Sequence, residues 1–180
     1  MFLSCEDALD WAYLTSAHPI VKTAMINKMR QGSGSGRKND LLVNLTVQDL
    51  HGQAALIIGL IDKLGDPAGR EYIKARFGRR IMREDLRFLV YRSCDCLGVG
   101  LEKQEPVYGL LRAYFLNCLS TRTIRKSIGC RHYYAALLKS ALYEMLDLIH
   151  DRAMAEIAEI FERQGLIEGR GQIKQGMMIR

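Results

Sequence analysis

The spacing of apolar residues is helical along almost the whole of this 180-residue chain. From Leu138 to Ile160 a stripe recurs at intervals of four or three residues, with Glu156 as its polar exception, which predicts one helix from His132 to Gln164. The members of this stripe are Leu138, Leu142, Met145, Ile149, Ala153, Glu156 and Ile160. Shorter stretches of helical spacing begin near Ser4, Ile20, Thr46, Pro67, Arg83 and Pro106. The pattern therefore predicts an all-α protein, a multi-helix bundle with a long C-terminal helix.

Capping residues predict where several of these helices begin and end. Thr46 has Asp49 three residues on, the arrangement that satisfies first-turn N–H groups. Asp66 suits an N-cap and Pro67 suits the first helical turn, while Gly78 is expected to close the helix that they open. A further helix is expected over residues 83–97, and one that Pro106 opens should lead into the segment around residue 120.

These elements divide the chain into six parts. We expect an N-terminal helical pair at residues 1–31, a flexible Gly/Ser loop at 32–45, a helical core with a basic face at 46–119, a helix-turn-helix at 120–139, a long acidic C-terminal helix at 140–168 and a flexible tail at 169–180. The Gly/Ser stretch from Gly32 to Asp40 lacks the phosphate-binding spacing GxxxxGK[ST], and no strand precedes it. We interpret it as a surface insertion.

Residues 120–138, STRTIRKSIGCRHYYAALL, have the layout of a helix-turn-helix. Ser120 or Thr121 serves as the N-cap of the first helix. Ile124 and Ile128 fall four residues apart on one face, and Gly129 can adopt the left-handed conformation that ends this helix. The apolar positions of the turn and the second helix are Cys130, Ala135 and Leu138.

The outer surface of this motif is expected to be cationic. Four basic residues and no acidic one lie between Ser120 and Arg131. Two residues depart from the usual pattern: Arg125 stands where Ala or Gly is preferred, so its stem must lie outward, and Arg131 stands where a Ser or Thr cap is usual. Tyr133 or Tyr134 can hydrogen-bond to phosphate. The alternative is a plain helix–Gly–helix joint whose arginines simply face water.

The charge of the chain is unevenly distributed. The formal net charge is +6, yet residues 70–131 hold fourteen basic against six acidic side chains, and residues 140–168 hold seven acidic against two basic ones. Such an asymmetry favours a polyanionic partner for the middle of the chain and a protein or solvent for its end. The residues expected to form a secondary basic face are Arg70, Lys74, Arg76, Arg79, Arg80 and Arg83.

The chain lacks the sequence patterns of common enzymes and metal sites. The four histidines lie in separate segments, outside HExxH and GxSxG motifs, so we expect no catalytic site and no cofactor. Cysteines that could suggest zinc do not form paired CxxC knuckles, and buried cysteine packs well in helical cores, so no metal is expected. These cysteines are Cys94, Cys96, Cys118 and Cys130.

The same reasoning bears on location. No run of about 18 apolar residues exists, so we expect no membrane-spanning segment. The first residues, MFLSCEDALDW, lack the features of a secretory signal. Five cysteines, an odd number, then most simply indicate reduced thiols in the cytoplasm.

Three segments resemble a known family. Trp11 in its helix, DLHGQAALIIGLIDKL, and AYFLNCLSTRTIRKSIGCRHYYAALLKSALYEML resemble the phage late-gene antitermination regulators of the Q type, over residues 5–15 and 48–148 with gaps. The last segment also resembles promoter-binding region 4 of sigma factors. The resemblance implies a phage or prophage transcription regulator that binds DNA and contacts RNA polymerase or a sigma factor. The DNA-facing residues that it implies are Ser120, Arg122, Arg125, Arg131, His132, Tyr133 and Lys139.

The function expected from the sequence is therefore binding of double-stranded DNA. Lys126 joins the phosphate-binding residues, Arg131 and His132 are expected at base edges, and Lys139 at the backbone. The long helix either pairs two copies in a homodimer or packs on its own bundle. The main alternative is a non-enzymatic helical adaptor or oligomeric assembly protein that binds an acidic protein, and RNA binding also stays open.

Overall fold

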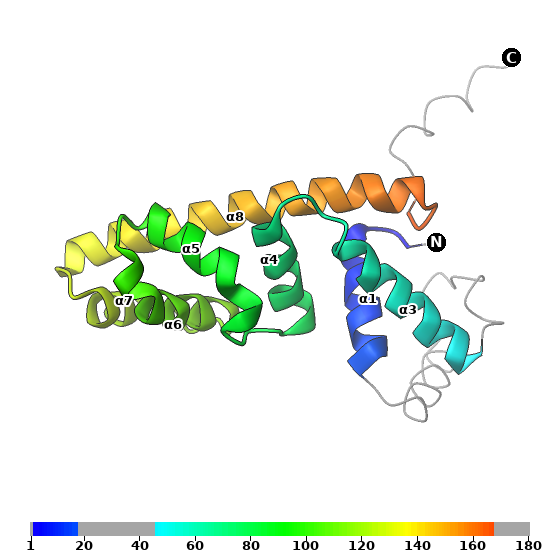
Figure 1. Ribbon diagram of the computed structural model, residues 1–180, viewed down its shortest axis with the longest axis horizontal. Helices are drawn as coiled ribbons and strands as arrows, with labels where there is room; N and C mark the ends of the chain where they lie inside the picture. The colour runs from blue at the N-terminus through cyan, green and yellow to red at the C-terminus, as the bar shows by residue number, and fades with distance from the viewer. Residues whose placement is uncertain (1, 18–45, 168–180) are drawn as a thin grey trace, which may run out of the picture. The chain divides into compact units, whose positions relative to one another are not determined.

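The computed structural model describes residues 2–17 and 46–167. The named elements in these two ranges are all helices (Figure 1). The α-helices are α1 (Cys5–Ala17), α3 (Val47–Ile61), α4 (Pro67–Gly78), α5 (Arg87–Cys96), α6 (Gln104–Phe115), α7 (Thr121–Ile128) and α8 (His132–Arg163). This confirms the all-α fold and the long C-terminal helix. The helix expected from Ile20, the Gly32–Asp40 loop and the tail at 169–180 lie outside the described residues.

The predicted helix starts have their capping bonds. Thr46 Oγ1 accepts from Asp49 N at 3.2 Å, and Asp49 Oδ2 accepts from Thr46 N at 2.9 Å, which completes a capping box for α3. Asp66 is the N-cap of α4, where its side chain accepts from Ala68 N at 3.1 Å, and Pro67 is the first helical residue. Local sequence rules therefore predict these two starts correctly.

Gly78 is the last residue of α4, as predicted, and Arg79 after it takes the left-handed conformation with φ 52°. Other predicted boundaries differ from the structure by a few residues. The helix expected over residues 83–97 is a 3-10 turn, η2 (Glu84–Leu86), followed by α5. A second 3-10 turn, η3 (Leu101–Lys103), precedes α6, which begins at Gln104; Pro106 fits inside its first turn, where no N–H is needed.

The contacts divide the chain into two compact units. The first comprises residues 1–63 and 155–180, and the second comprises residues 64–154. In the first unit α1 packs on α3, with Leu9 of α1 and Ile57 of α3 buried, so α3 is grouped with α1, and the other helices of the expected 46–119 core are grouped in the second unit. The apolar side of α3 is covered by α1, which the linear order of the helices does not reveal. Phe2 N donates to Leu166 O at 2.9 Å in this same unit.

The second unit is built from α4 to α7 and the first part of α8. Tyr72 of α4 is buried at its centre, with ring centroids 5.5 Å from Phe115 of α6 and 5.6 Å from His150 of α8. The hydroxyls of Tyr72 and Tyr114 lie 3.2 Å apart. Burial and this hydrogen bond raise the pKa of Tyr114. These aromatic contacts join three helices that are distant in sequence.

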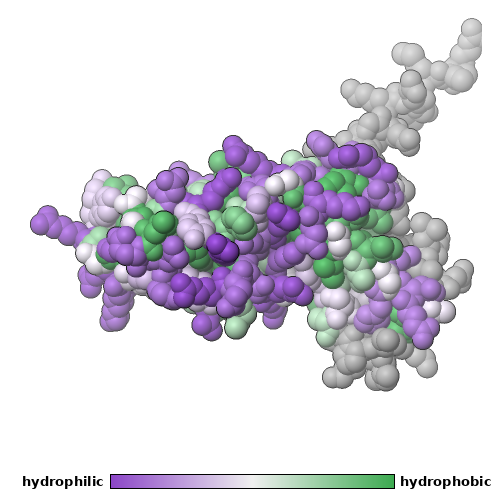
Figure 2. Space-filling view, in the orientation of Figure 1, coloured by the Kyte–Doolittle hydropathy of each residue, from purple (hydrophilic) through white to green (hydrophobic). Residues whose placement is uncertain are grey.

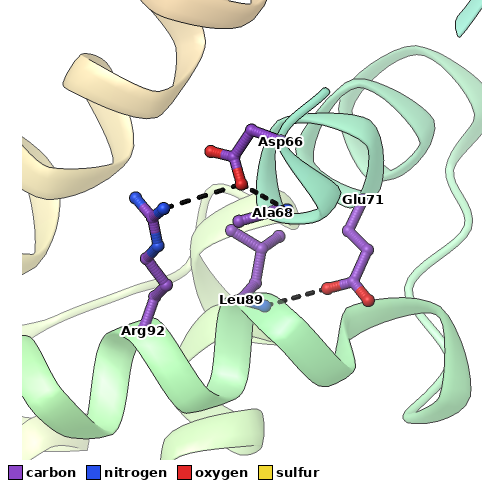
Figure 3. A network of polar contacts seen from close by, with 5 residues as sticks. All are labelled: Asp66, Ala68, Glu71, Leu89 and Arg92. Carbon is purple, nitrogen blue, oxygen red and sulfur yellow. Dashed lines mark hydrogen bonds and ion pairs between the residues drawn. The ribbon is translucent and has the colours of Figure 1, made fainter. Parts of the chain in front are cut away.

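Polar contacts join α4 to α5 (Figure 3). Glu71 of α4 accepts from Leu89 N at 2.8 Å, so it satisfies a first-turn N–H of α5, whose own N-cap residue makes no side-chain capping bond. Asp66 Oδ1 lies 3.6 Å from Arg92 Nη2 and also caps α4. Burial raises the pKa of Glu71, against the opposing effect of its backbone hydrogen bonds. Glu71 therefore acts as a cap supplied by another helix.

The buried stripe of α8 differs in part from the predicted stripe. Met145, Glu156 and Ile160 are only half-buried, because the buried side takes a step of four residues after Leu142 and again after Ala153, where the predicted stripe takes a step of three. The buried residues are Ala135, Leu138, Leu142, Leu146, Ile149, Ala153, Ile157 and Phe161. All of them are covered within a single chain. This agrees with the alternative in which the stripe packs on its own bundle.

Candidate nucleic-acid interface

The corner formed by α7, Gly129 and the start of α8 consists of two helices joined at a glycine, at the positions that the sequence predicts. Ser120 Oγ accepts from Thr123 N at 3.1 Å and so caps α7. Gly129 is left-handed with φ 77°, and its N–H donates to Arg125 O at 3.0 Å. In Figure 1 the corner lies at the left end of the second unit, where α7 meets the beginning of α8.

Apolar side chains hold this corner against the unit. Ile124 and Ile128 of α7 are buried, as are Ala135 and Leu138 of α8, as the sequence predicts. α7 packs on α6. Lys103 Nζ donates to Ile128 O at 3.0 Å, which places a positive charge at the C-terminal end of α7, where the helix dipole favours it. The corner is therefore supported from inside while its outer side is exposed.

The exposed side of the corner is cationic. Arg122, Arg125, Lys126 and Arg131 are all exposed, and none of them forms an ion pair with another described residue. The stem of Arg125 is accommodated outward, as its position requires. No Asp or Glu occurs in the sequence between residues 106 and 143. Figure 2 shows hydrophilic side chains projecting at this end of the unit. The positive charge of the corner is thus not neutralised by carboxylates of the described chain.

The first turns of α8 expose apolar side chains that the charge pattern alone does not predict. Tyr133 is 75% exposed, Tyr134 52% and Leu137 50%. Tyr133 and Leu137 each lie two positions from Ala135, so they are on the side of α8 opposite to the buried stripe. Sequence reasoning missed Leu137, although its position outside the predicted stripe is the signal that identifies it. His132 is also exposed.

Lys139 lies away from this outward side of α8. It is half-buried, and its Nζ is 5.5 Å from the ring centroid of Tyr143, one turn further along the helix. The cation is therefore already in contact with an aromatic ring of its own helix. Its predicted contact with a DNA backbone stays a prediction, but the structure does not group it with Tyr133 and Leu137.

The outward side of α8 becomes acidic after Ser140. Ser140 Oγ donates to Glu144 Oε1 at 3.1 Å, and both residues are exposed. Asp147 and Asp151 follow on the same side at helical spacing and are also exposed. Only the part of α8 that precedes Glu144 thus presents an uncharged surface beside the cationic corner.

The residues expected to form a secondary basic face differ in their surroundings. Arg83 is paired with Glu105, and Arg70 and Lys74 are half-buried and make contacts of their own. Arg83 is exposed as well as paired, and Arg76, Arg79 and Arg80 are exposed without an ion pair to another described residue. The loop after α4 lies at the opposite end of the second unit from the α7–α8 corner (Figure 1). The basic residues of this loop are therefore separate from those of the corner.

The cysteines are separate free thiols. Cys94 is buried, Cys96 Sγ donates to Ala141 O at 3.5 Å, Cys118 is exposed and Cys130 is half-buried. Burial raises the pKa of the Cys94 and Cys96 thiols, which disfavours the thiolate that binds metals. Across residues 2–17 and 46–167 no three His, Cys, Asp or Glu side chains are grouped as metal ligands would be.

Two further findings concern membrane-spanning helices and similarity to known proteins. None of the helices in the described ranges combines the length and the apolar character required to traverse a bilayer. In comparisons with known proteins, no family model, no curated protein and no solved structure matches the chain.

Proposed function

We propose that this chain is a DNA-binding transcription regulator encoded by a phage or prophage. The observation that carries the proposal is the corner of α7, Gly129 and α8, with four exposed basic side chains that have no carboxylate partner in the described chain. In the proposal the beginning of α8 enters the major groove, as the second helix of such a motif does. The resemblance to Q-type regulators extends the proposal to antitermination and to contact with RNA polymerase or a sigma factor.

In this proposal some basic residues contact phosphates and others contact base edges. Arg122, Arg125 and Lys126 of α7 neutralise phosphates, with Ser120 beside them, and these contacts supply affinity that falls with salt. Arg131 and His132 precede or begin α8, so they reach base edges first, and arginine pairs bidentately with guanine. The proposal concerns binding alone, without a catalytic residue or a cofactor.

The change of charge along α8 limits the part that contacts DNA. Apart from Lys139, whose cation lies over the ring of Tyr143, residues 132–140 carry no Lys, Arg, Asp or Glu; the segment is about 13 Å long at 1.5 Å per residue, roughly four base-pair steps of 3.4 Å. Glu144, Asp147 and Asp151 would be repelled by phosphates if the helix lay deeper along the groove. Arg76, Arg79 and Arg80, at the other end of the unit, contribute long-range attraction only.

The cytoplasm is the compartment that this proposal requires. The five free cysteines are consistent with it, because thiols persist in a reducing environment. A homodimer would place two such corners on one duplex and double the contacts.

A protein partner is the second candidate. Exposure of Tyr133, Tyr134 and Leu137 favours it, because aromatic side chains are enriched at protein interfaces. In that case the chain is a helical adaptor whose cationic corner meets an acidic protein. Titration with duplex DNA over a range of salt separates the two candidates, since counterion release from DNA gives a linear dependence of log K on log salt.

The test uses duplexes selected from a random library by the full-length protein, with affinity measured by fluorescence anisotropy. Arg131→Ala should cost about 1–3 kcal/mol on the selected duplex and relax preference at one position, whereas Lys126→Ala should weaken all duplexes alike and lower the salt slope by about one. Arg76→Ala is the matched control, because Arg76 is exposed and lies on α4. The proposal fails if no duplex binds at low salt, or if both corner substitutions bind as the wild type does.

A further inference from the structure

Phosphate binding and guanine recognition leave the apolar outward side of α8 unexplained. Tyr133 and Leu137 are four residues apart, are 75% and 50% exposed, and lie opposite to the buried Ala135 and Leu138. Ala136 between them is also exposed. In a helix that lies in a groove, this is the side that faces the base pairs. Arg, Asn and Gln, whose side chains pair bidentately with base edges, are absent from this side.

The major groove offers one apolar group, the C5-methyl of thymine. We propose that Tyr133 and Leu137 contact thymine methyl groups, so that the preferred duplex carries thymines beside the base pair recognised by Arg131; this inference rests on the DNA-binding function proposed above. Four residues of helix rise about 6 Å. Base pairs are spaced about 3.4 Å apart, so the two thymines are about two steps apart.

The charge distribution around this surface favours duplex DNA as its occupant. The sequence has no acidic residue from 106 to 143, and Arg131 and the α7 cations border the first turn of α8 without ion pairs among the described residues. A polyanion complements that border, and the acidic residues begin again only at Glu144. The apolar side chains thus lie where the cations would hold a duplex.

Replacement of thymine by uracil tests the assignment, because it removes one methyl group from the DNA and leaves the protein intact. The duplex selected from a random library is synthesised with uracil at each thymine in turn, and affinity is measured by anisotropy at fixed salt. Two of these duplexes should bind the wild type about fourfold more weakly, the factor that corresponds to roughly 0.8 kcal/mol for one buried methyl group. Leu137→Ala should abolish the loss at one of the two positions, and Tyr133→Ala at the other.

Leu148→Ala is the matched control. Leu148 is also 50% exposed on α8, but it lies beyond Glu144, so this variant should keep the wild-type ratio of thymine to uracil affinity. Uracil substitution without effect at every position overturns the thymine assignment while DNA binding stands. A wild-type uracil effect that persists in full in both Leu137→Ala and Tyr133→Ala overturns the choice of residues. Failure of every duplex to bind at low salt removes the proposed function itself.

Discussion

Replacement of Gly129 by Ala isolates the backbone requirement of the α7–α8 corner. Gly129 has φ 77°, and a Cβ built on it meets no atom within 4 Å, so the substitution adds strain without a clash. The left-handed conformation costs an L-residue about 1–2 kcal/mol. The lower entropy of the unfolded alanine chain returns about 0.4–1 kcal/mol. We expect Gly129→Ala to lower the free energy of unfolding by about 1 kcal/mol.

Gly109 provides the matched control in the same unit. It lies exposed within α6, and a Cβ there also meets nothing within 4 Å. Gly109→Ala should therefore raise the free energy of unfolding by about 1 kcal/mol through helix propensity. Urea unfolding followed by circular dichroism measures both variants, and for a slope of about 2 kcal/mol/M their midpoints should differ by about 1 M. Midpoints that shift in the same direction by the same amount would refute the reasoning.

Two further predictions concern packing within the second unit. Burial raises the pKa of Glu71, so the folded state holds a proton on this carboxyl at a pH where the unfolded state has released it. The contribution of the protonated carboxyl to the free energy of unfolding is therefore complete below the ordinary pKa of 4.5. It is lost as the pH rises through the folded-state pKa. Urea titrations at several pH values measure the free energy of unfolding of the wild type minus that of Glu71→Gln. This difference should fall as the pH rises from 4.5 through the folded-state pKa, and a difference that does not change with pH would contradict the prediction. A Cβ at Gly69 lies 3.2 Å from Ala153 Cβ, so Gly69→Val should cost about 1–3 kcal/mol in thermal unfolding. Ala153→Gly should recover part of that loss, and no recovery would show that the contact is not responsible.

Local sequence signals predicted the backbone and the buried residues of the α7–α8 corner correctly. Ser120 as cap, the buried pair Ile124 and Ile128, and the left-handed Gly129 were each predictable, because caps and glycine turns depend on atoms a few residues away. The start of α3 at Thr46 follows the same rule. Steric and hydrogen-bonding requirements of this kind act over one helical turn, so a short stretch of sequence contains them in full.

The exposed surface of α8 was only partly predictable. The charge pattern favours Lys139 as a contact residue, but Lys139 is half-buried and lies over the ring of Tyr143. The sequence does not single out Leu137 for the site, because an apolar residue in a helix usually belongs to the core. The burial of its neighbours Ala135 and Leu138 shows which side of α8 faces outward.

The sequence by itself determined the all-helical class, the caps and the glycine bend between α7 and α8, since each depends on short-range geometry and apolar spacing. Only the tertiary structure decided that α3 packs on α1, that Glu71 caps α5 from 18 residues away, and that Arg83 is paired with Glu105. The tertiary structure also separated the loop after α4 from the α7–α8 corner. These relations depend on which helix faces cover one another, and burial of apolar surface selects that arrangement without regard to distance along the chain.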